Sequence, residues 1–365
     1  MQTRVVMLAD FDYFFAQCEE LRNPQIKDKP IVVGVYSGRT EESGAVSTSN
    51  YIARKYGVKS GMPLFLAKRK LEGTEAVFFK VDHEYYDQIS DRIMQIFRTY
   101  ATSLEQVSVD EAYLDVTEQV EGSFEMARGY AQKIKADVKA QVGISFTIGV
   151  GPNKIVAKIA CDSQKPDGLT IVKPQEAQIF LEPLEVCCLL GVGKKTSVKM
   201  AEMGIKTIGD LAKYDCQRLI EVFGRALGIY FHNAANAVDN EPVQEQGEAE
   251  SISRIGTLKQ DTRDLEFILQ KTNELTEDVY NDLTKRGLSF KLVSIYAVNV
   301  DLSSKSRSTT LEQPAKDKET IKKNTKSLFE KYLAESSLGI RRVGVRVSAF
   351  SKEEPKQKQL SSFFL

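Results

Sequence analysis

Histidine and cysteine are scarce in this chain of 365 residues. The only histidines are His83 and His232, which disfavours a Ser-His-Asp or Cys-His mechanism because both need a histidine base. None of the five cysteines forms a Cys-x-x-Cys pair. We therefore expect free thiols, mostly buried, and neither a zinc site nor a disulfide framework.

Long apolar runs are also missing. No run approaches the roughly 20 residues of a membrane-spanning helix, and the N-terminus lacks the pattern of a secretory signal. We therefore expect an intracellular, cytoplasmic protein with no membrane partner. The chain is too long for one compact core, so two to four domains are expected.

Charge is balanced overall but unevenly distributed, with 50 basic and 50 acidic side chains. Residues 237–250 contain five acidic and no basic side chains, whereas residues 251–350 contain 18 basic and 13 acidic ones. Such a basic module could follow a polyanion, although basic faces are more often plain solvated surface.

The first 166 residues alternate strand and helix patterns. Strand, helix, strand, strand, helix, strand is the split β-α-β order of a ferredoxin-like sheet, and residues 20–75 look inserted into it. The predicted strands are 5–9, 31–36, 76–81, 105–109, 112–116 and 146–150, and the predicted helices are 12–21, 48–56, 84–100, 124–141 and 154–161.

The rest of the chain predicts three kinds of segment. Residues 175–236 have the pattern of short helices punctuated by glycine, and residues 237–250 have the composition of a linker. Residues 251–350 mix strands and helices, which indicates a small α+β domain, and residues 351–365 are a polar tail that we expect to be disordered.

Three carboxylates are predicted to converge. Asp10 ends the first apolar strand, and Asp110 and Glu111 sit at the hairpin between two later strands, which lies beside that strand end in a ferredoxin-like sheet. Such a cluster repels itself unless hard cations neutralise it, and Mg²⁺ suits oxygen ligands and phosphate. Ordinary turn or cap acids remain the alternative, because spacing alone does not decide between them.

Four segments closely resemble the Y family of translesion DNA polymerases, of the DinB or polymerase IV type. They are ADFDYFFAQCEE (9–20), SGAVSTSNYIARKYGVKSGMP (43–63), SVDEAYLD (108–115) and GVGPNKIVAKIACDSQKPDG (149–168). The resemblance implies an α+β, multidomain right-hand architecture with a ferredoxin-like palm. The implied parts are palm 1–19 and 76–166, fingers 20–75, thumb 167–236, linker 237–250, α+β little finger 251–350 and tail 351–365.

The resemblance also implies roles for the acidic residues. Asp10 and Asp110 match shared ligands of two Mg²⁺ ions, for which Mn²⁺ can substitute. Glu111 matches a ligand of the ion that activates the primer hydroxyl, and the carbonyl of Phe11 a ligand of the nucleotide-side ion. Two further acids match the family pattern without a metal role. They are Asp12 and Asp115.

The nucleotide pocket is implied in the same way. Phe15 matches the ring that clashes with a 2′-hydroxyl, the group that separates RNA from DNA. Tyr13 and Phe14 are expected to present backbone amides to the phosphates, with their side chains in the core. Three residues with the spacing i, i+3 and i+6 would share a helix face that binds the triphosphate. A lysine that matches the family pattern would also contact the phosphates, and small residues would line the fingers over the base pair. They are Thr48, Tyr51 and Arg54, then Lys165, then Ala45, Ser47, Ser60 and Gly61.

Residues 189–204 (LLGVGKKTSVKMAEMG) look like a helix-hairpin-helix. Gly191 and Gly193 permit a tight turn whose amides face a DNA phosphate, and Lys194 and Lys195 add charge. A plain helical turn is the alternative. In the little finger, basic residues on predicted strands and their edges suggest sequence-independent tracking of the DNA backbone. They are Arg254, Lys291, Lys305, Arg307, Arg341, Arg342 and Arg346.

The last residues, KQKQLSSFFL, resemble the peptide that docks on ring-shaped sliding clamps of the archaeal and eukaryotic kind. The matching positions are Gln357, Leu360, Phe363 and Phe364. We therefore expect a monomeric translesion DNA polymerase that acts on primer-template DNA and dNTPs without a proofreading domain. A two-metal nucleotidyl cyclase and a non-catalytic DNA-binding adaptor tethered to a clamp are the alternatives.

Overall fold

The computed structural model describes residues 3–245, 247 and 249–352. The chain divides into two compact units, which are treated separately below. The first unit consists of Met1–Gly34, Val46–Met62 and Ala67–Gln246, and the second of Val35–Ala45, Pro63–Leu66 and Gly247–Leu365.

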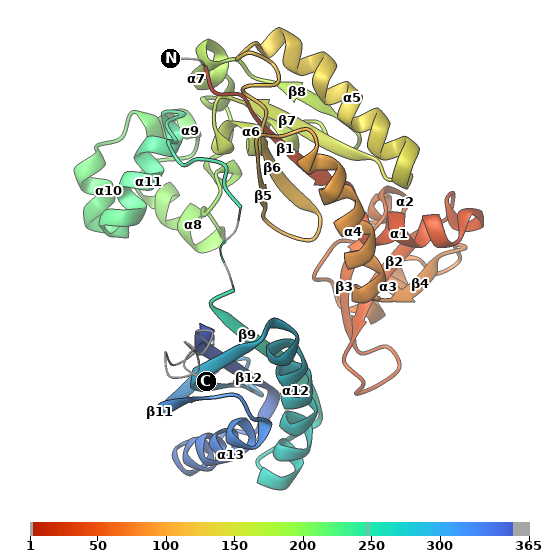
Figure 1. Ribbon diagram of the computed structural model, residues 1–365, viewed down its shortest axis with the longest axis vertical. Coiled ribbons are helices and arrows are strands. Elements are labelled where there is room, and N and C mark those ends of the chain that lie inside the picture. Colours follow the sequence, from red (N-terminus) through yellow and green to blue (C-terminus); the bar gives the residue numbers. More distant parts are fainter. Residues whose placement is uncertain (1–2, 246, 248, 353–365) are drawn as a thin grey trace, which may run out of the picture. The chain divides into compact units, whose positions relative to one another are not determined.

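A five-stranded sheet organises the first unit, with the order β5-β6-β1-β7-β8 (Figure 1). Its central strand β1 runs antiparallel to both β6 and β7. Apart from the added β8, this is the strand order of a ferredoxin-like fold, as predicted. The strands are β1 (Val6–Phe11), β5 (Ser103–Gln106), β6 (Glu111–Asp115), β7 (Phe146–Gly151) and β8 (Leu169–Ile171).

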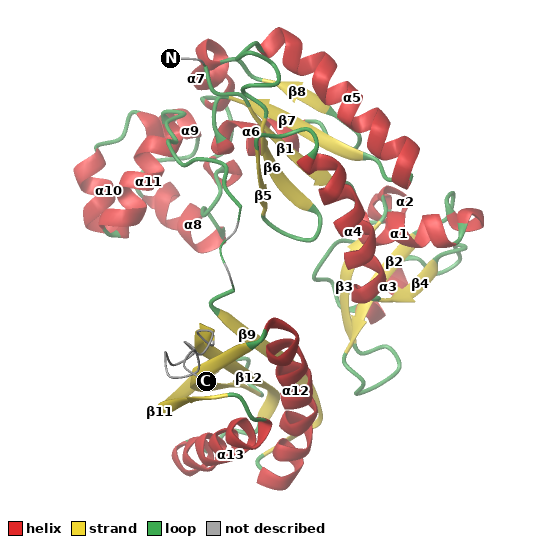
Figure 2. Cartoon of the chain, viewed as in Figure 1, coloured by secondary structure: helices red, strands yellow, loops and turns green. Residues whose placement is uncertain are grey.

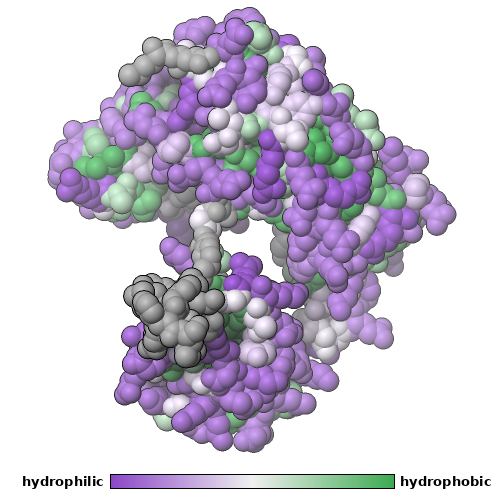
Figure 3. Space-filling model, in the orientation of Figure 1, coloured by the Kyte–Doolittle hydropathy of each residue, from purple (hydrophilic) through white to green (hydrophobic). Residues whose placement is uncertain are grey.

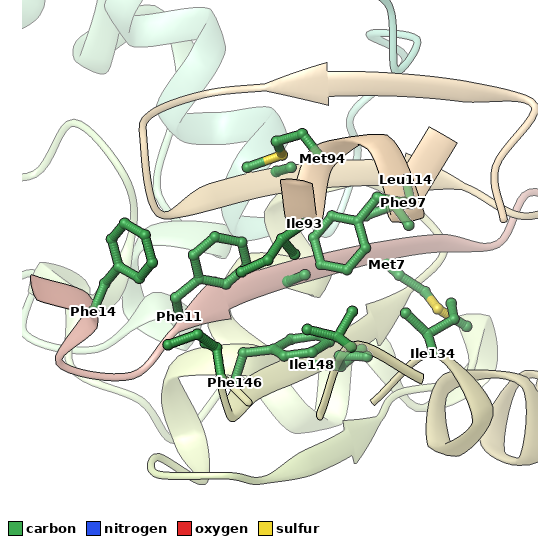
Figure 4. Close-up of a cluster of buried hydrophobic side chains, with 14 of the residues drawn as sticks. Met7, Phe11, Phe14, Ile93, Met94, Phe97, Leu114, Ile134, Phe146 and Ile148 are labelled. Atoms are coloured by element: carbon green, nitrogen blue, oxygen red, sulfur yellow. The ribbon is translucent and has the colours of Figure 1, made fainter. Parts of the chain in front are cut away.

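The two faces of β1 (Val6–Phe11) serve different purposes. Met7 and Phe11 point into the main core beneath α4 (His83–Arg98) and α5 (Phe124–Val142), as Figure 4 shows. Val6 and Leu8 pack on the other face, against α6 (Lys154–Ser163). Because side chains alternate along a strand, Asp10 emerges on the α6 face.

A smaller three-stranded sheet has the order β3-β2-β4, and β2 pairs in parallel with β4. Strand β3 is a correction to the predicted helix at 48–56, because Thr48 lies in β3 and the helix begins only at Tyr51. Its elements are α1 (Phe14–Arg22), η1 (Pro24–Ile26), β2 (Ile31–Tyr36), β3 (Gly44–Ser49), α2 (Tyr51–Lys55), α3 (Leu64–Lys70) and β4 (Val77–Lys80).

Short helices follow the large sheet, as the glycine-punctuated pattern predicts. Their apolar side chains form one cluster that also includes Val156 and Ile159 of α6. The elements are η2 (Pro174–Glu176), α7 (Ala177–Leu181), η3 (Val186–Cys188), α8 (Lys194–Glu202), α9 (Ile208–Ala212), α10 (Cys216–Phe223) and α11 (Arg225–Ala235).

The first part of the segment expected to be a linker is attached to the large sheet. Val243 is only 4% exposed and joins the cluster formed by Val6 and Leu8. The Arg4 guanidinium donates hydrogen bonds to the carbonyls of Asp239 and Glu241, each at 2.8 Å. The described residues up to 245 are therefore not a free tether, and composition gave no sign of this because the partners lie more than 200 residues away.

The second unit contains the predicted α+β domain, a four-stranded antiparallel sheet of order β11-β10-β12-β9 with two long helices (Figure 2). The sheet and helices share one apolar core. The elements are β9 (Ser251–Thr262), α12 (Leu265–Arg286), β10 (Leu288–Asn299), β11 (Ser304–Ala315), α13 (Lys318–Glu335) and β12 (Ile340–Lys352).

No helix within the described residues is long and apolar enough to cross a membrane. The face of the molecule drawn in Figure 3 is mostly hydrophilic, with apolar residues scattered over it.

Candidate active site

The three residues whose carboxylates were predicted to converge lie at the C-terminal end of β1. Asp10 lies directly opposite Glu111 in the β1–β6 register, and the amide of Phe11 donates to the carbonyl of Asp110 at 2.8 Å. Glu111 is the first residue of β6 rather than a member of the turn. The turn therefore brings Asp110 to the strand end, and the register brings Glu111 to the α6 face beside Asp10.

Two lysines occupy this acidic cluster. The Lys165 ammonium lies 2.5 Å from Asp10 Oδ2. The Lys158 ammonium lies 3.3 Å from the same oxygen and 3.0 Å from Glu111 Oε1. Burial lowers the pKa of each ammonium, but the neighbouring carboxylates outweigh it and the pKa values of Lys158 and Lys165 are raised. Both lysines are thus held in the charged form against the acids.

Burial raises the pKa of the Glu111 carboxyl, and the Lys158 ammonium partly offsets this. The Asp110 carboxylate instead accepts a hydrogen bond from Ser108 Oγ at 2.6 Å. Among the described residues, no group of three or more His, Cys, Asp or Glu side chains is arranged as a metal site. Asp10 and Glu111 are instead ion-paired with the Lys158 and Lys165 ammoniums.

Asp12 takes part in a separate, buried network. Its carboxylate accepts hydrogen bonds from Thr147 Oγ1 at 2.9 Å and from the amide of Asp167 at 2.7 Å. Burial raises the pKa of Asp12 and these hydrogen bonds lower it, with burial the stronger effect. Asp12 therefore ties the end of β1 to the segment after α6, and its carboxylate faces protein donors.

A pocket of about 360 Å³ opens beside the strand end. Its lining includes Asp10 and Asp110, whereas Glu111 lines a neighbouring cleft with Lys158 and Tyr113. The other lining residues are Phe11, Asp12, Tyr13, Phe14, Phe15, Ser47, Thr48, Tyr51, Arg54, Ser60, Val109 and Lys165.

Three aromatic residues form one wall of the pocket. Phe14 is 2% exposed and belongs to the core, while Tyr13 and Phe15 are half-buried. Tyr13 has a left-handed backbone, with φ of 39°, directly before α1 (Phe14–Arg22). The chain thus turns sharply from β1 into α1 around the pocket.

The pocket lining also includes the three residues predicted to share one helix face, and the Tyr51 ring meets the Tyr13 ring edge-on at 5.5 Å. Tyr51 and Arg54 lie on α2, and the Arg54 guanidinium stacks 4.5 Å from the centre of the Tyr51 ring. Thr48 reaches the pocket from β3 instead. The common helix face was therefore wrong for Thr48, because Asn50 caps α2 by accepting from the amide of Ala53 and fixes its start.

The predicted helix-hairpin-helix lies at η3, the Gly191 turn and α8 (Lys194–Glu202). Gly191 has a φ of +84°, and Gly193 is the N-cap of α8 without a side-chain cap. Lys194 and Lys195 are exposed in the first turn. First-turn amides of an uncapped helix face outward, which suits an anion.

Sequence reasoning missed Lys158, which contacts both Asp10 and Glu111. A signal was present, because Lys154 and Lys158 are spaced i, i+4 on the helix beside β1. The clamp-binding residues predicted in the tail lie outside the described residues.

Family models match most of the chain. Residues 9–162 match the impB/mucB/samB family, residues 249–361 match its C-terminal domain, and residues 189–239 match the thumb domain of DNA polymerase iota.

Curated relatives agree over the full length. The chain is 44% identical to the DNA polymerase IV of Nitrosopumilus maritimus over 365 residues, which is 100% of both chains. It is 42% identical to the DNA polymerase IV of Methanosarcina acetivorans, over 97% of this chain and 98% of the relative.

Solved structures are similar as well. A Y-family DNA polymerase chimera, Dbh-Dpo4(243-245)-Dbh, superimposes with a TM-score of 0.90 and 36% identity, covering 96% of this chain and 100% of the other. The insertion ternary complex of Dbh DNA polymerase gives a TM-score of 0.68 with the same identity and coverage.

Proposed function

Because the chain belongs to the impB/mucB/samB family of Y-family DNA polymerases and is a translesion DNA polymerase, we propose that Asp10, Asp110 and Glu111 form its catalytic acidic cluster. The observation that carries this proposal is the β1–β6 register, which sets Asp10 opposite Glu111 and ties Phe11 to Asp110 at the strand end.

The proposed cofactor is a pair of Mg²⁺ ions, for which Mn²⁺ can substitute. The donor set fits, since Asp10, Asp110, Glu111 and the Phe11 carbonyl offer only oxygen, and two of these carboxylates already bind cationic groups. Asp10 and Asp110 would hold both ions, Glu111 the primer-side ion and Phe11 the nucleotide-side ion. When bound, the ions stabilise the charge on the attacking and leaving oxygens.

The remaining pocket residues are proposed to hold the nucleotide. Thr48, Tyr51 and Arg54 present two hydroxyls and a guanidinium from one wall, which suits triphosphate oxygens. Lys165 supplies an ammonium from the other side, and it would exchange Asp10 for the triphosphate. The tolerance for damaged templates is consistent with the small residues Ser47 and Ser60 in the lining.

A primer-template extension assay tests this assignment of the reaction. The full chain with Mg²⁺, a labelled primer on a longer template and the four dNTPs is expected to extend the primer, opposite undamaged and damaged template bases. A cyclic product formed from nucleotide alone would indicate a cyclase instead. DNA binding without incorporation would indicate an adaptor.

We propose that the α8 hairpin holds the DNA backbone. Changing both Lys194 and Lys195 to alanine is expected to weaken duplex binding and to make the slope of log K against log salt shallower by about two, because each lysine neutralises about one phosphate. Fluorescence anisotropy across a salt series measures this.

The matched control for this pair is Lys213→Ala. Lys213 lies in the same helical region but is already ion-paired with Glu182 at 2.6 Å, so its loss should leave the slope unchanged. Equal slopes for the double variant and the wild type would contradict the proposed hairpin contact.

Several of the little-finger arginines predicted to contact DNA are already engaged with other side chains. Arg254 is ion-paired with Asp282, Arg307 with Glu335 and Arg341 with Asp261, and Arg346 donates to the Tyr296 hydroxyl. These arginines would have to exchange partners to reach phosphate. Lys291, Lys305 and Arg342 form no such ion pair within the part of the chain that the structure describes, and they are the better candidates.

The tail is proposed to bind a sliding clamp. Changing Phe363 and Phe364 to alanine is expected to lower the affinity for a clamp of the archaeal kind by about tenfold or more. The reason is that the change removes two aromatic side chains that would anchor the peptide. Isothermal titration with the purified clamp measures it. Ser361 and Ser362, changed to alanine, are the matched control in the same tail, and an unchanged affinity in the phenylalanine variant would rule out this docking mode.

A further inference from the structure

Phe15 is supported from behind by a second aromatic ring. Its side chain lines the pocket and stacks on Tyr86, which is not a lining residue, with ring centres 4.4 Å apart and planes inclined by 20°. His83 meets the same ring edge-on at 6.0 Å. Among the described residues, Tyr86 is the only ring stacked on Phe15 in this way.

Tyr86 is itself held in place by a buried carboxylate. Tyr86 lies on α4 with 0% exposure, and its hydroxyl donates to Glu19 Oε1 at 2.7 Å. Glu19 is 1% exposed, and its other carboxylate oxygen has no hydrogen-bond partner among the described residues. Arg22 Nη1 lies 3.9 Å from Glu19 Oε1.

This bond matters because an unpaired buried carboxylate is costly. Burial and the Glu19 carboxylate both raise the pKa of the Tyr86 phenol, so the hydroxyl keeps the proton that it donates. Glu19 follows Phe15 by one helical turn on α1, so both contact Tyr86 from the same helix face. The Glu19–Tyr86 bond therefore fixes the ring that lies behind Phe15.

We propose that Tyr86, anchored by Glu19, is a positioning residue that sets how far the Phe15 ring projects into the nucleotide pocket and thereby the exclusion of ribonucleotides. The inference rests on the proposed role of Phe15 and goes beyond it. Excluding a single 2′-hydroxyl by steric clash requires the Phe15 ring to stay in place to well under an ångström. A ring with empty space behind it could move back and admit the hydroxyl.

Single-nucleotide insertion with matched dNTP and rNTP tests this, using the ratio of the two kcat/KM values. Tyr86→Leu removes the flat support, and we expect the dNTP-to-rNTP ratio to fall about tenfold or more. The dNTP kcat/KM should stay within about threefold of the wild type, since Tyr86 does not line the pocket.

Two further variants distinguish the effect of the stacked Tyr86 ring from the effects of its hydroxyl and of a neighbouring substitution on α4. Tyr86→Phe keeps the stacked ring but loses the Glu19 bond, so its ratio should lie between those of the wild type and Tyr86→Leu, with a lowered melting temperature. Tyr85→Leu is the matched control, because Tyr85 is the neighbouring tyrosine but is not stacked on Phe15; its ring packs under the Arg22 guanidinium at 3.9 Å and its hydroxyl donates to the Cys18 carbonyl at 3.4 Å. Its ratio should be unchanged. If Tyr86→Leu fails to fold, Tyr86→Met takes its place with the same expected ratio.

Phe15→Ala, measured in the same assay, distinguishes failure of the Tyr86 inference from failure of the proposed role of Phe15. A lowered ratio in Phe15→Ala with a wild-type ratio in Tyr86→Leu would overturn the inference and leave the role of Phe15 intact. A wild-type ratio in both variants would overturn the role of Phe15 and the inference with it. A lowered ratio in Tyr86→Leu that Tyr86→Phe partly restores is the expected result.

Discussion

Replacing Asp110 with alanine is expected to lower primer extension by about a thousandfold or more, because charge stabilisation at the reacting phosphate supplies most of the acceleration in this chemistry. DNA affinity should stay within about threefold of the wild type. Asp110 lies at the β1 strand end, and its side chain accepts a hydrogen bond only from Ser108 within the described residues. Its loss therefore removes a proposed ion ligand without opening the core.

The matched control is Asp115→Ala. Asp115 lies five residues after Asp110, at the far end of β6, and caps a turn by accepting from the amide of Thr117 at 3.0 Å. It is remote from the pocket lining. Near-normal extension by Asp115→Ala together with lost extension by Asp110→Ala would show that the reaction depends on Asp110 itself. It would exclude a general effect of removing an acidic side chain from this part of the sheet.

Extension at fixed DNA concentration across a Mg²⁺ series, with chelator added at the end, measures the effect, and anisotropy measures DNA binding. Extension by Asp110→Ala at the wild-type rate would remove Asp110 from the site. Equal loss of DNA binding and extension would point to misfolding, which circular dichroism melting detects.

The lysines in the site explain how the acidic cluster is tolerated in this structure. Asp10 and Glu111 lie side by side on one sheet face, and like charges so placed repel. Lys158 and Lys165 offset that repulsion at 3.0 and 2.5 Å from their respective partners. Under the proposed metal assignment, the same ammoniums would have to move away from Asp10 and Glu111.

The sequence predicted where Asp10, Asp110 and Glu111 lie in the sheet, because their placement depends on local patterns and on strand alternation. The apolar run before Asp10 predicts a buried strand, and the hairpin at Asp110 predicts its neighbour. Strand β8 was missed because its three residues carry no period and its place depends on pairing with β7. Strand β3 was missed because polar residues hid its alternation, so its sequence looked like the start of the following helix.

Contacts between distant segments were beyond sequence reasoning. Val243 packs against β1 and Tyr86 packs against Phe15 over separations that no local pattern encodes. Glu19 looks in the sequence like a surface acid of an amphipathic helix, whereas the structure buries it. Charged residues are rarely fully buried without a partner, and the partner of Glu19, Tyr86, lies 67 residues away in the sequence. The burial of Glu19 therefore became visible only in the folded structure.

Replacing Phe15 with alanine is expected to raise the kcat/KM for ribonucleotides about a hundredfold, because the truncated side chain leaves room for the 2′-hydroxyl. The ring lines the pocket, and its removal also leaves the Tyr86 ring facing the space that it filled. Insertion of each rNTP and dNTP opposite its complementary template base measures the change.

Phe14→Ala is the informative contrast to Phe15→Ala. Phe14 is 2% exposed and packs on Phe11 at 5.1 Å, so its truncation should cost about 3–5 kcal/mol of stability as a core cavity. The dNTP-to-rNTP ratio should change little. If Phe15→Ala leaves sugar selection as in the wild type, the selection must come from backbone or from the polar wall at Thr48 and Tyr51, and Phe15 would be a structural ring of the pocket.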